Sequence, residues 1–137
     1  MLTEISPKFE SRFFDQEADY ELVCQWWKEQ NWPPAPKEFL HQGLMITLGS
    51  QPIAAGFIFQ TDSPMAILEW IIANPKVPFE VRGAALDALI EDLCFVAKKL
   101  GFSKVFTMTK HKRLIEREVE HGFLKTDEGV THLIREL

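Results

Sequence analysis

The chain has little of several residue types on which common functions depend. Its 137 residues include two cysteines, Cys24 and Cys94, with no Cys-x-x-Cys motif and no cysteine–histidine group at zinc spacing. We therefore expect two reduced, buried thiols and no metal site. No apolar run reaches the roughly 18–20 residues that span a bilayer, and the N-terminus lacks a basic stretch followed by an apolar one. These absences predict a cytoplasmic protein without a membrane partner.

Positive charge and tyrosine are also scarce. Fifteen lysines and arginines stand against twenty aspartates and glutamates, which gives a net charge of −5. A broad basic face for phosphate backbones is not expected, so nucleic acid is not predicted as a partner. Tyrosine occurs once, at Tyr20, beside eleven phenylalanines and four tryptophans. A mechanism that uses a tyrosine proton has only that residue to use.

The overall composition and length of the chain are those of an ordinary globular protein. Hydrophobic residues make up 46% and charged residues 26% of the sequence, close to the averages for folded domains. The length suits one domain, which buries roughly two-thirds of the surface that the unfolded chain exposes. We predict a single domain over residues 1–137 whose core needs neither a disulfide nor a metal.

Apolar periodicity and turn signals predict the secondary structure. Strands are expected at 9–14, 44–48, 53–60, 65–73 and 103–109, helices at 15–30, 79–100 and 110–121, and a short helical turn at 36–41. A terminal hairpin is expected from 122–126 and 130–136 around the Asp127-Glu-Gly129 turn. The order β-α-α-β-β-β-α-β-α-β-β predicts an α+β fold of three layers, with a mixed, mostly antiparallel sheet flanked by helices.

The junction between the strand at 65–73 and the helix at 79–100 is the most informative stretch. Small residues fall in the first turns of the helix, where unpaired backbone N–H groups and the positive end of the helix dipole lie. Arg82 adds positive charge there. The pattern indicates an anion site at a helix N-terminus, although many strand–helix turns carry a glycine and an arginine without binding a ligand.

The element order and the sequence Glu80-Val81-Arg82-Gly83-Ala84-Ala85 resemble the GNAT superfamily of acetyl-CoA-dependent acyltransferases over nearly the whole chain. The family pattern is Gln/Arg-x-x-Gly-x-Gly/Ala. Gly83 matches its first glycine and Ala85 the permitted alanine. Glu80 departs from the first position, and Arg82 is the residue that can compensate for its charge. Leu100-Gly101-Phe102 and His121-Gly122-Phe123 are similar to further family signatures.

The resemblance implies acetyl-CoA as co-substrate and no metal. It places the pyrophosphate on the backbone of the residues that begin the helix at 79–100, which are Val81, Arg82, Gly83, Ala84, Ala85 and Leu86. In the family the strand equivalent to 65–73 splays from its neighbour and admits the pantetheine arm. The resemblance therefore implies backbone contacts from Ile71 and Ala73.

The resemblance also gives candidate catalytic residues. Glu69 is a lone carboxylate among apolar residues, at a place where several GNAT enzymes carry the general base; otherwise it is a structural carboxylate. The family's general acid is a tyrosine shortly before the Gly-Phe pair, and here Glu118 stands four residues before Gly122. His111 falls where the family has an asparagine. The proton donor is thus His111, Glu118 or water, unless this helix face is simply solvated.

Three tryptophans are candidates for the acceptor pocket: Trp26, Trp32 and Trp70. Trp27 shares the apolar face of its helix and is expected in the core. The Trp26-Trp27 pair, the proline-rich turn, Thr61-Asp-Ser63, Glu69-Trp70 and Asn74-Pro75 are similar to small GNAT-like proteins encoded by phages and prophages. On that resemblance the cytoplasm would be that of the host cell.

The sequence therefore predicts an acyl-CoA-dependent N-acyltransferase. Acetyl would pass from acetyl-CoA to a small-molecule or protein amine by direct attack, and the acidic balance leaves an amine acceptor open. The alternatives are a GNAT-fold protein without catalysis, acting as a binding or virion-associated module, and a binder of small ligands that does not use CoA. The exposed end of the predicted terminal hairpin makes a homodimer an expectation as well.

Overall fold

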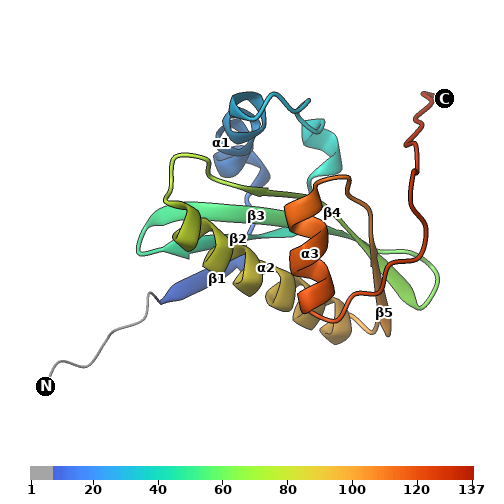
Figure 1. Cartoon of the computed structure of the whole chain (residues 1–137). Helices are drawn as coiled ribbons and strands as arrows, with labels where there is room; N and C mark the ends of the chain where they lie inside the picture. The colour runs from blue at the N-terminus through green and yellow to red at the C-terminus, as the bar shows by residue number, and fades with distance from the viewer. Residues whose placement is uncertain (1–7) are drawn as a thin grey trace, which may run out of the picture.

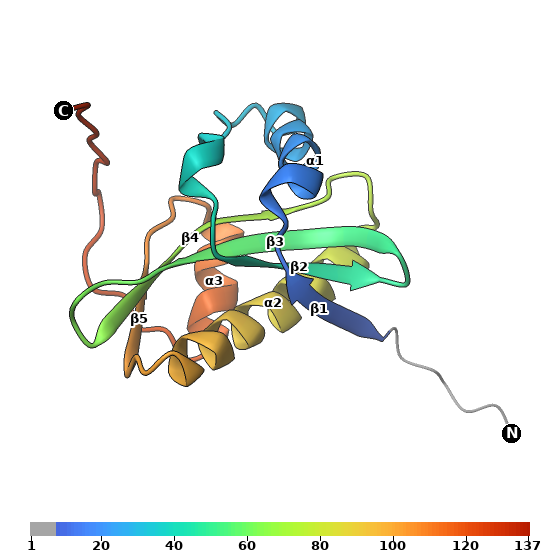
Figure 2. The same cartoon turned by 180° about the vertical axis from the view of Figure 1, so that it is seen from behind.

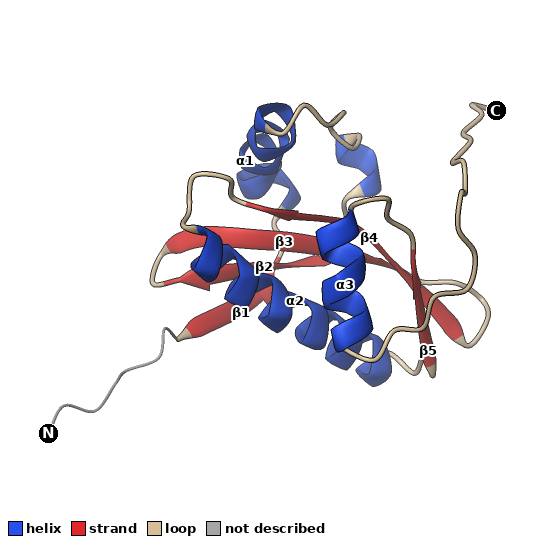
Figure 3. Cartoon of the chain, in the orientation of Figure 1, coloured by secondary structure: helices blue, strands red, loops and turns tan. Residues whose placement is uncertain are grey.

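The computed structural model describes residues 8–137, so the N-terminal segment, in which no signal-like pattern is expected, lies outside the described residues. One sheet has the strand order β1-β2-β3-β4-β5, as Figures 1 and 3 show. The strands are β1 Phe9–Phe13, β2 Gly43–Leu48, β3 Gln51–Phe59, β4 Met65–Ala73 and β5 Lys104–Thr107. The first four strands are antiparallel to their neighbours, and β5 runs parallel to β4. The predicted α+β class with a mixed sheet is confirmed.

Helices cover both faces of this sheet. They are α1 Gln16–Glu29, the 3-10 helix η1 Lys37–Phe39, α2 Phe79–Lys99 and α3 Lys112–Glu120. Figures 1 and 2 show α2 and α3 on one face, and α1 with η1 on the other. Two buried apolar clusters correspond to these faces, one between α2 and the sheet and one between α1 and the sheet. None of the helices described in residues 8–137 combines the length and apolar character that crossing a membrane requires.

The long helix α2 follows from the apolar spacing in the sequence. Its buried residues, which recur at helical intervals, are Ala85, Leu89, Ile90, Leu93 and Ala97. Gly101 ends the helix with a φ of +101°, and its N–H donates to the Lys98 carbonyl at 3.0 Å. That left-handed backbone is the conformation glycine adopts most cheaply, which is why the helix ends there.

A bulge interrupts β4 next to its centre. Glu69 pairs with Phe57 and Ile72 pairs with Ala55, so Trp70 and Ile71 together lie opposite Gly56. Trp70 has a φ of +52°, a strained conformation for a bulky residue that persists only where the surrounding structure imposes it. A Cβ on Gly56 would lie 2.9 Å from Leu93 Cδ1. The glycine therefore lets α2 pack directly over the bulge.

Strands β4 and β5 pair only as far as Leu68 and Thr107. Beyond that point β4 continues through the bulge for five more residues, whereas β5 ends. The end of the parallel pairing and the bulge therefore coincide, and they leave one edge of β4 from residue 69 onward without a strand partner among the described residues.

The predicted terminal hairpin is wrong. Residues 123–137 contain no strand, and Figures 1 and 2 show them passing β5 and ending clear of the sheet. Apolar alternation indicates a strand only where a neighbour accepts its hydrogen bonds, and β5 offers just four residues. Those few bonds do not offset the conformational entropy of ordering a fifteen-residue segment.

Candidate functional site

Two glutamates lie near the point where β4 and β5 part, close enough for the charge of Glu69 to act on Glu118. Glu69 lies on β4 directly before the bulge, and Glu118 lies on α3 with only 4% of its surface exposed. Each carboxylate has one buried oxygen without a hydrogen-bond partner, Oε1 of Glu69 and Oε2 of Glu118. Thr107 ends β5 beside them, and its hydroxyl donates to the Leu68 carbonyl at 2.8 Å. Unsatisfied buried carboxylate oxygens are costly, so they mark a place where function, not packing, sets the residue type.

The protonation of this pair differs from that of exposed carboxylates. Burial raises the pKa of Glu69, against a smaller opposing effect of His132 and of the backbone N–H groups of Trp70 and Met108. Burial raises the pKa of Glu118 to about 7, and the charge of Glu69 adds to the shift. Two neighbouring carboxylates resist ionising together. A pKa of about 7 leaves a large share of the Glu118 carboxyl protonated near neutral pH.

The free edge of β4 begins at this pair. The N–H of Asn74 donates to Ile53 on β3 at 2.7 Å. Because backbone groups alternate direction along a regular strand, the N–H group of Ala73 points away from β3. Ile71 lies in the bulge, where this alternation is interrupted. Ile71 and Ala73, the two backbone contacts expected from the family resemblance, both belong to the part of β4 that extends beyond its pairing with β5.

The N-terminus of α2 lies beyond the end of β4. The Arg82 N–H is bonded to the Pro78 carbonyl at 3.0 Å, and the N–H groups of the three residues before it have no carbonyl one turn back to bond. The Nε of Arg82 is buried without a partner, while Glu80 is exposed. The Arg113 guanidinium lies 4.6 Å from the centre of the Phe79 ring, so a second positive group stands beside the same helix end. These groups fit an anion such as a phosphate.

The other residues expected at this helix end differ in surroundings. Gly83 faces α3, where a Cβ on it would lie 3.0 Å from Nη2 of Arg117. Ala84 is exposed, Ala85 is buried in the core, and Val81 and Leu86 are partly buried against the α2 cluster. The structure thus places all six residues in the first two turns of α2, but gives Gly83 a packing role that the family pattern does not state.

A polar network that sequence reasoning missed fixes α3 on α2. Arg117 donates to the Gly83 carbonyl at 3.0 Å and to Oδ1 of Asp87 at 2.8 Å. His121 lies 2.9 Å from the same Asp87 oxygen and 3.2 Å from Glu91. The bonds to Asp87 and Glu91 raise the pKa of His121 against the effect of burial. The network holds the helix that carries Glu118, and its partners lie at least 30 residues apart, so no local motif announces it.

The three tryptophans predicted to line the acceptor pocket have different surroundings in the structure. Trp26 is 2% exposed and belongs to the buried α1 cluster, so it cannot form an exposed pocket wall as predicted. The segment after α1 packs into the same cluster and covers it. Trp32 is partly buried and stacks on His111 with 4.0 Å between ring centres. Burial and Lys110 lower the pKa of His111. Trp70 packs its ring edge-on to Phe59 at 5.6 Å and belongs to the cluster on the α1 side of the sheet.

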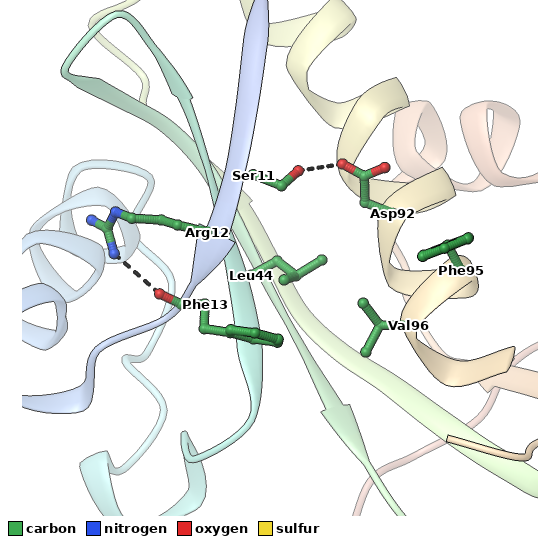
Figure 4. A pocket seen from close by; sticks show the side chains of 7 residues that line it. All are labelled: Ser11, Arg12, Phe13, Leu44, Asp92, Phe95 and Val96. Carbon is green, nitrogen blue, oxygen red and sulfur yellow. Dashed lines mark hydrogen bonds between the residues drawn. The ribbon is translucent and has the colours of Figure 1, made fainter. Parts of the chain in front are cut away.

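Two surface hollows lie elsewhere on the molecule. One, of about 310 Å³, lies between β1 and α2 and is lined by Ser11, Arg12, Phe13, Leu44, Asp92, Phe95 and Val96. Figure 4 shows Ser11 donating a hydrogen bond across it to Asp92. The other, of about 490 Å³, lies between the end of α2 and β5. Neither hollow includes Glu69 or Glu118.

Comparisons with known proteins agree on the architecture. No protein-family model and no curated protein sequence matches the chain. A Mycobacterium tuberculosis protein solved with CoA superposes with a TM-score of 0.70 at 17% identity, over 89% of this chain and 76% of its own. Glucosamine-6-phosphate N-acetyltransferase from Arabidopsis thaliana gives 0.66 at 13% identity, over 93% and 99%. An aminoglycoside N-acetyltransferase in complex with CoA gives 0.63 at 18% identity, over 98% and 99%. At these identities the likeness is one of fold.

Proposed function

We propose that this chain, which has the fold of the GNAT acetyltransferases, transfers an acetyl group from acetyl-CoA to a small-molecule amine. The observation that supports the proposal is the presence of the partly buried Glu69 and the buried Glu118 at the point where β4 and β5 part, each with an unpartnered buried oxygen. In this proposal Glu69 is the carboxylate base and Glu118, with a pKa of about 7, is the acid that amine acylation needs.

In this proposal acetyl-CoA lies along the free edge of β4. Its pyrophosphate binds the N-terminal turn of α2, where the N–H groups of residues 79–81 are free, the buried Nε of Arg82 lacks a partner and the helix dipole favours negative charge. Its pantetheine arm accepts hydrogen bonds from the N–H groups of Ile71 and Ala73. Glu80 is exposed to solvent, so its charge is screened from the phosphates by water.

The chemistry is a direct attack on the thioester. The amine nitrogen bonds to the thioester carbonyl carbon while the Glu69 carboxylate accepts the proton that the nitrogen loses. The carbon–sulfur bond then breaks, and Glu118 gives its proton to the departing thiolate. Transfer of the new proton from Glu69 to Glu118 restores the starting state. His111 has a smaller part in this account, because burial and Lys110 lower its pKa and so leave less of the ring protonated near neutral pH.

A small-molecule acceptor is supported by two partly buried tryptophan rings and by the names of two solved structures with the same fold. Trp70 and Trp32 offer partly buried rings on the α1 side of the sheet, suited to flanking a small molecule. Two of the fold neighbours are named for glucosamine-6-phosphate and for aminoglycosides. These observations support a small-molecule amine over a protein amine. Water exclusion around the pair would raise the strength of each charge interaction in the transition state.

A second candidate function is a GNAT-fold binding protein without catalysis. The described part of α3 carries no tyrosine, and Glu80 replaces the family's polar or basic residue at the phosphate turn. Tyr20, the one tyrosine of the chain, lies on α1 and donates to the Ala35 carbonyl at 2.8 Å, so it serves the fold. A protein that binds acetyl-CoA but never turns it over would fit this candidate.

Turnover of acetyl-CoA with a panel of primary amines separates the two candidates. Release of the CoA thiol is followed with a chromogenic disulfide, with amino sugars, polyamines and amino acids as acceptors. We expect amine-dependent release, lowered by about 10²–10⁴-fold in kcat by Glu69→Gln with acetyl-CoA affinity retained. The control is Glu120→Gln, an exposed glutamate on α3. Release at the same rate in Glu69→Gln removes that residue from the mechanism.

A further inference from the structure

Strand β4 directs two consecutive side chains to the same side of the sheet. Glu69 pairs with Phe57, which belongs to the buried cluster on the α1 side, and directly opposite residues of an antiparallel pair share one face. Trp70 packs against the same cluster, whereas Ile71 packs against the cluster on the α2 side. Neighbouring side chains alternate in a regular strand, so the bulge turns Trp70 to the side of Glu69.

The backbone of Trp70 is strained by this arrangement. Its φ of +52° is unfavourable for a bulky side chain. Bulges re-aim side chains and occur often beside active sites, and strained residues gather where a ligand is bound or a reaction occurs. Here the strained residue directly follows Glu69, the base of the proposed reaction. The strain therefore indicates that the ring of Trp70 binds a ligand in addition to packing.

Further aromatic rings lie on the same side of the sheet. The ring centre of Trp70 is 5.6 Å from that of Phe59 on β3 and 6.0 Å from that of Phe39 in η1, and Figures 1 and 2 show η1 over this face. Phe106 on β5 pairs with Ile67, the partner of Phe59, so it faces the same side, with 38% of its surface exposed. We call Phe39, Phe59, Trp70 and Phe106 the aromatic face.

The chemistry of the aromatic face favours a flat apolar group beside a positive charge. Its four side chains carry a single hydrogen-bonding group, the indole N–H of Trp70. Aromatic rings pack on one another edge-on or offset. The hydroxyl groups of a sugar would lose water on such a surface and gain few partners. Glu69 adjoins the face and supplies a carboxylate for one amine group.

We infer that the aromatic face binds the acceptor, and that the acceptor is an arylalkylamine, a primary amine joined to an aromatic ring by a short chain. Its nitrogen lies at Glu69 and its ring lies against Trp70. The inference rests on the proposed acetyl transfer and narrows the acceptor within it. It also separates this chain from the fold neighbours named for glucosamine-6-phosphate and for aminoglycosides, since neither of those acceptors contains an aromatic ring.

Acceptors that differ by one ring test this assignment. 2-Phenylethylamine and ethylamine share the primary amine, and glucosamine represents the amino sugars. We expect kcat/KM for 2-phenylethylamine to exceed that for the other two by at least about tenfold. Trp70→Ala should raise KM for 2-phenylethylamine about tenfold, and by more than it raises KM for ethylamine, because only the first acceptor carries the ring.

A milder pair of variants keeps the test valid if Trp70→Ala does not fold, which circular dichroism reveals. Phe39→Leu removes a ring of the aromatic face, and its matched control is Phe102→Leu, which alters another partly buried phenylalanine on the α2 side of the sheet. Phe39→Leu should reduce the preference for 2-phenylethylamine over ethylamine, and Phe102→Leu should leave that preference unchanged.

Calorimetry of 2-phenylethylamine with the full chain gives a reading that does not require turnover. Binding that Trp70→Ala or Phe39→Leu weakens, without acetyl transfer to any amine, would retain the aromatic amine site and count against the proposed function. Acetylation of glucosamine or ethylamine as efficient as that of 2-phenylethylamine would overturn the inference and leave the proposed function standing. An absence of 2-phenylethylamine binding, or a preference that survives both variants, would overturn the inference as well.

Discussion

Replacing Glu118 with glutamine should stabilise the protein, and by an amount that depends on pH. The pKa of Glu118 rises from its ordinary value of 4.5 to about 7 in the folded state, because the side chain is 4% exposed and Glu69 lies nearby. A carboxyl whose pKa is higher in the folded than in the unfolded state holds its proton more tightly when folded. Ionisation therefore favours unfolding, and wild type loses stability as pH rises from about 4.5 through 7.

The size of the effect follows from the two pKa values. Linkage gives a cost to folding of about 1 kcal/mol at pH 5 and about 3 kcal/mol at pH 8.5 in wild type. Glutamine has nearly the shape of the protonated glutamate and does not titrate. The free energy of unfolding of Glu118→Gln relative to wild type should therefore increase by about 2–3 kcal/mol between pH 5 and pH 8.5.

Urea denaturation at the two pH values measures this difference at a fixed protein concentration. The control variant Glu120→Gln, exposed on the same helix, should change the free energy of unfolding by about 0.5 kcal/mol or less at either pH. An equal effect of Glu118→Gln at pH 5 and pH 8.5 would show that Glu118 is ionised in the folded protein at both. The proton-holding pair, and with it the proposed acid, would then be refuted.

Three further predictions concern the same region. Turnover should fall as pH rises through about 7, when Glu118 loses the proton that the leaving thiolate needs, and a pH–rate profile of kcat without that decline would contradict its role. Arg82→Ala should weaken acetyl-CoA about tenfold or more in calorimetry, whereas Lys99→Ala at the far end of α2 should not. Gly56→Val should cost about 1–3 kcal/mol in thermal unfolding, because its Cβ would lie 2.9 Å from Leu93 Cδ1; an unchanged melting temperature would show that α2 can move away.

The local pattern of apolar residues and turn signals predicts most of the helices and strands of the fold. Strand β4 has the predicted bounds, and α2 ends at Lys99, one residue before the predicted end. Both elements have unbroken apolar periodicity and clear stop signals, so the information lies within each segment. The terminal hairpin failed because its strands need a partner edge, and nothing within 122–136 states whether that edge is available in the same chain.

The candidate site was partly predictable for the same reason. Glu69 and Glu118 were candidates from their positions, but their proximity depends on how α3 docks on α2 through Arg117, Asp87 and His121. Such contacts join distant positions and leave no local signal. The bulge at Trp70 was also out of reach, since tryptophan rarely adopts a positive φ and the sequence around it suggests a regular strand. Trp26 was wrongly predicted to line the pocket, because the segment after α1 packs over it. That packing is a tertiary contact, which the sequence pattern around Trp26 does not reveal.

Direct titration of acetyl-CoA into the full chain tests the central claim most simply. Isothermal calorimetry should give one site per chain with a dissociation constant below about 1 mM, competed by CoA and weakened by Arg82→Ala. Binding of that kind would agree with a ligand seated on the free edge of β4 and the N-terminus of α2. An absence of heat with acetyl-CoA at several times that concentration, in a protein shown to be folded, would contradict the proposed function.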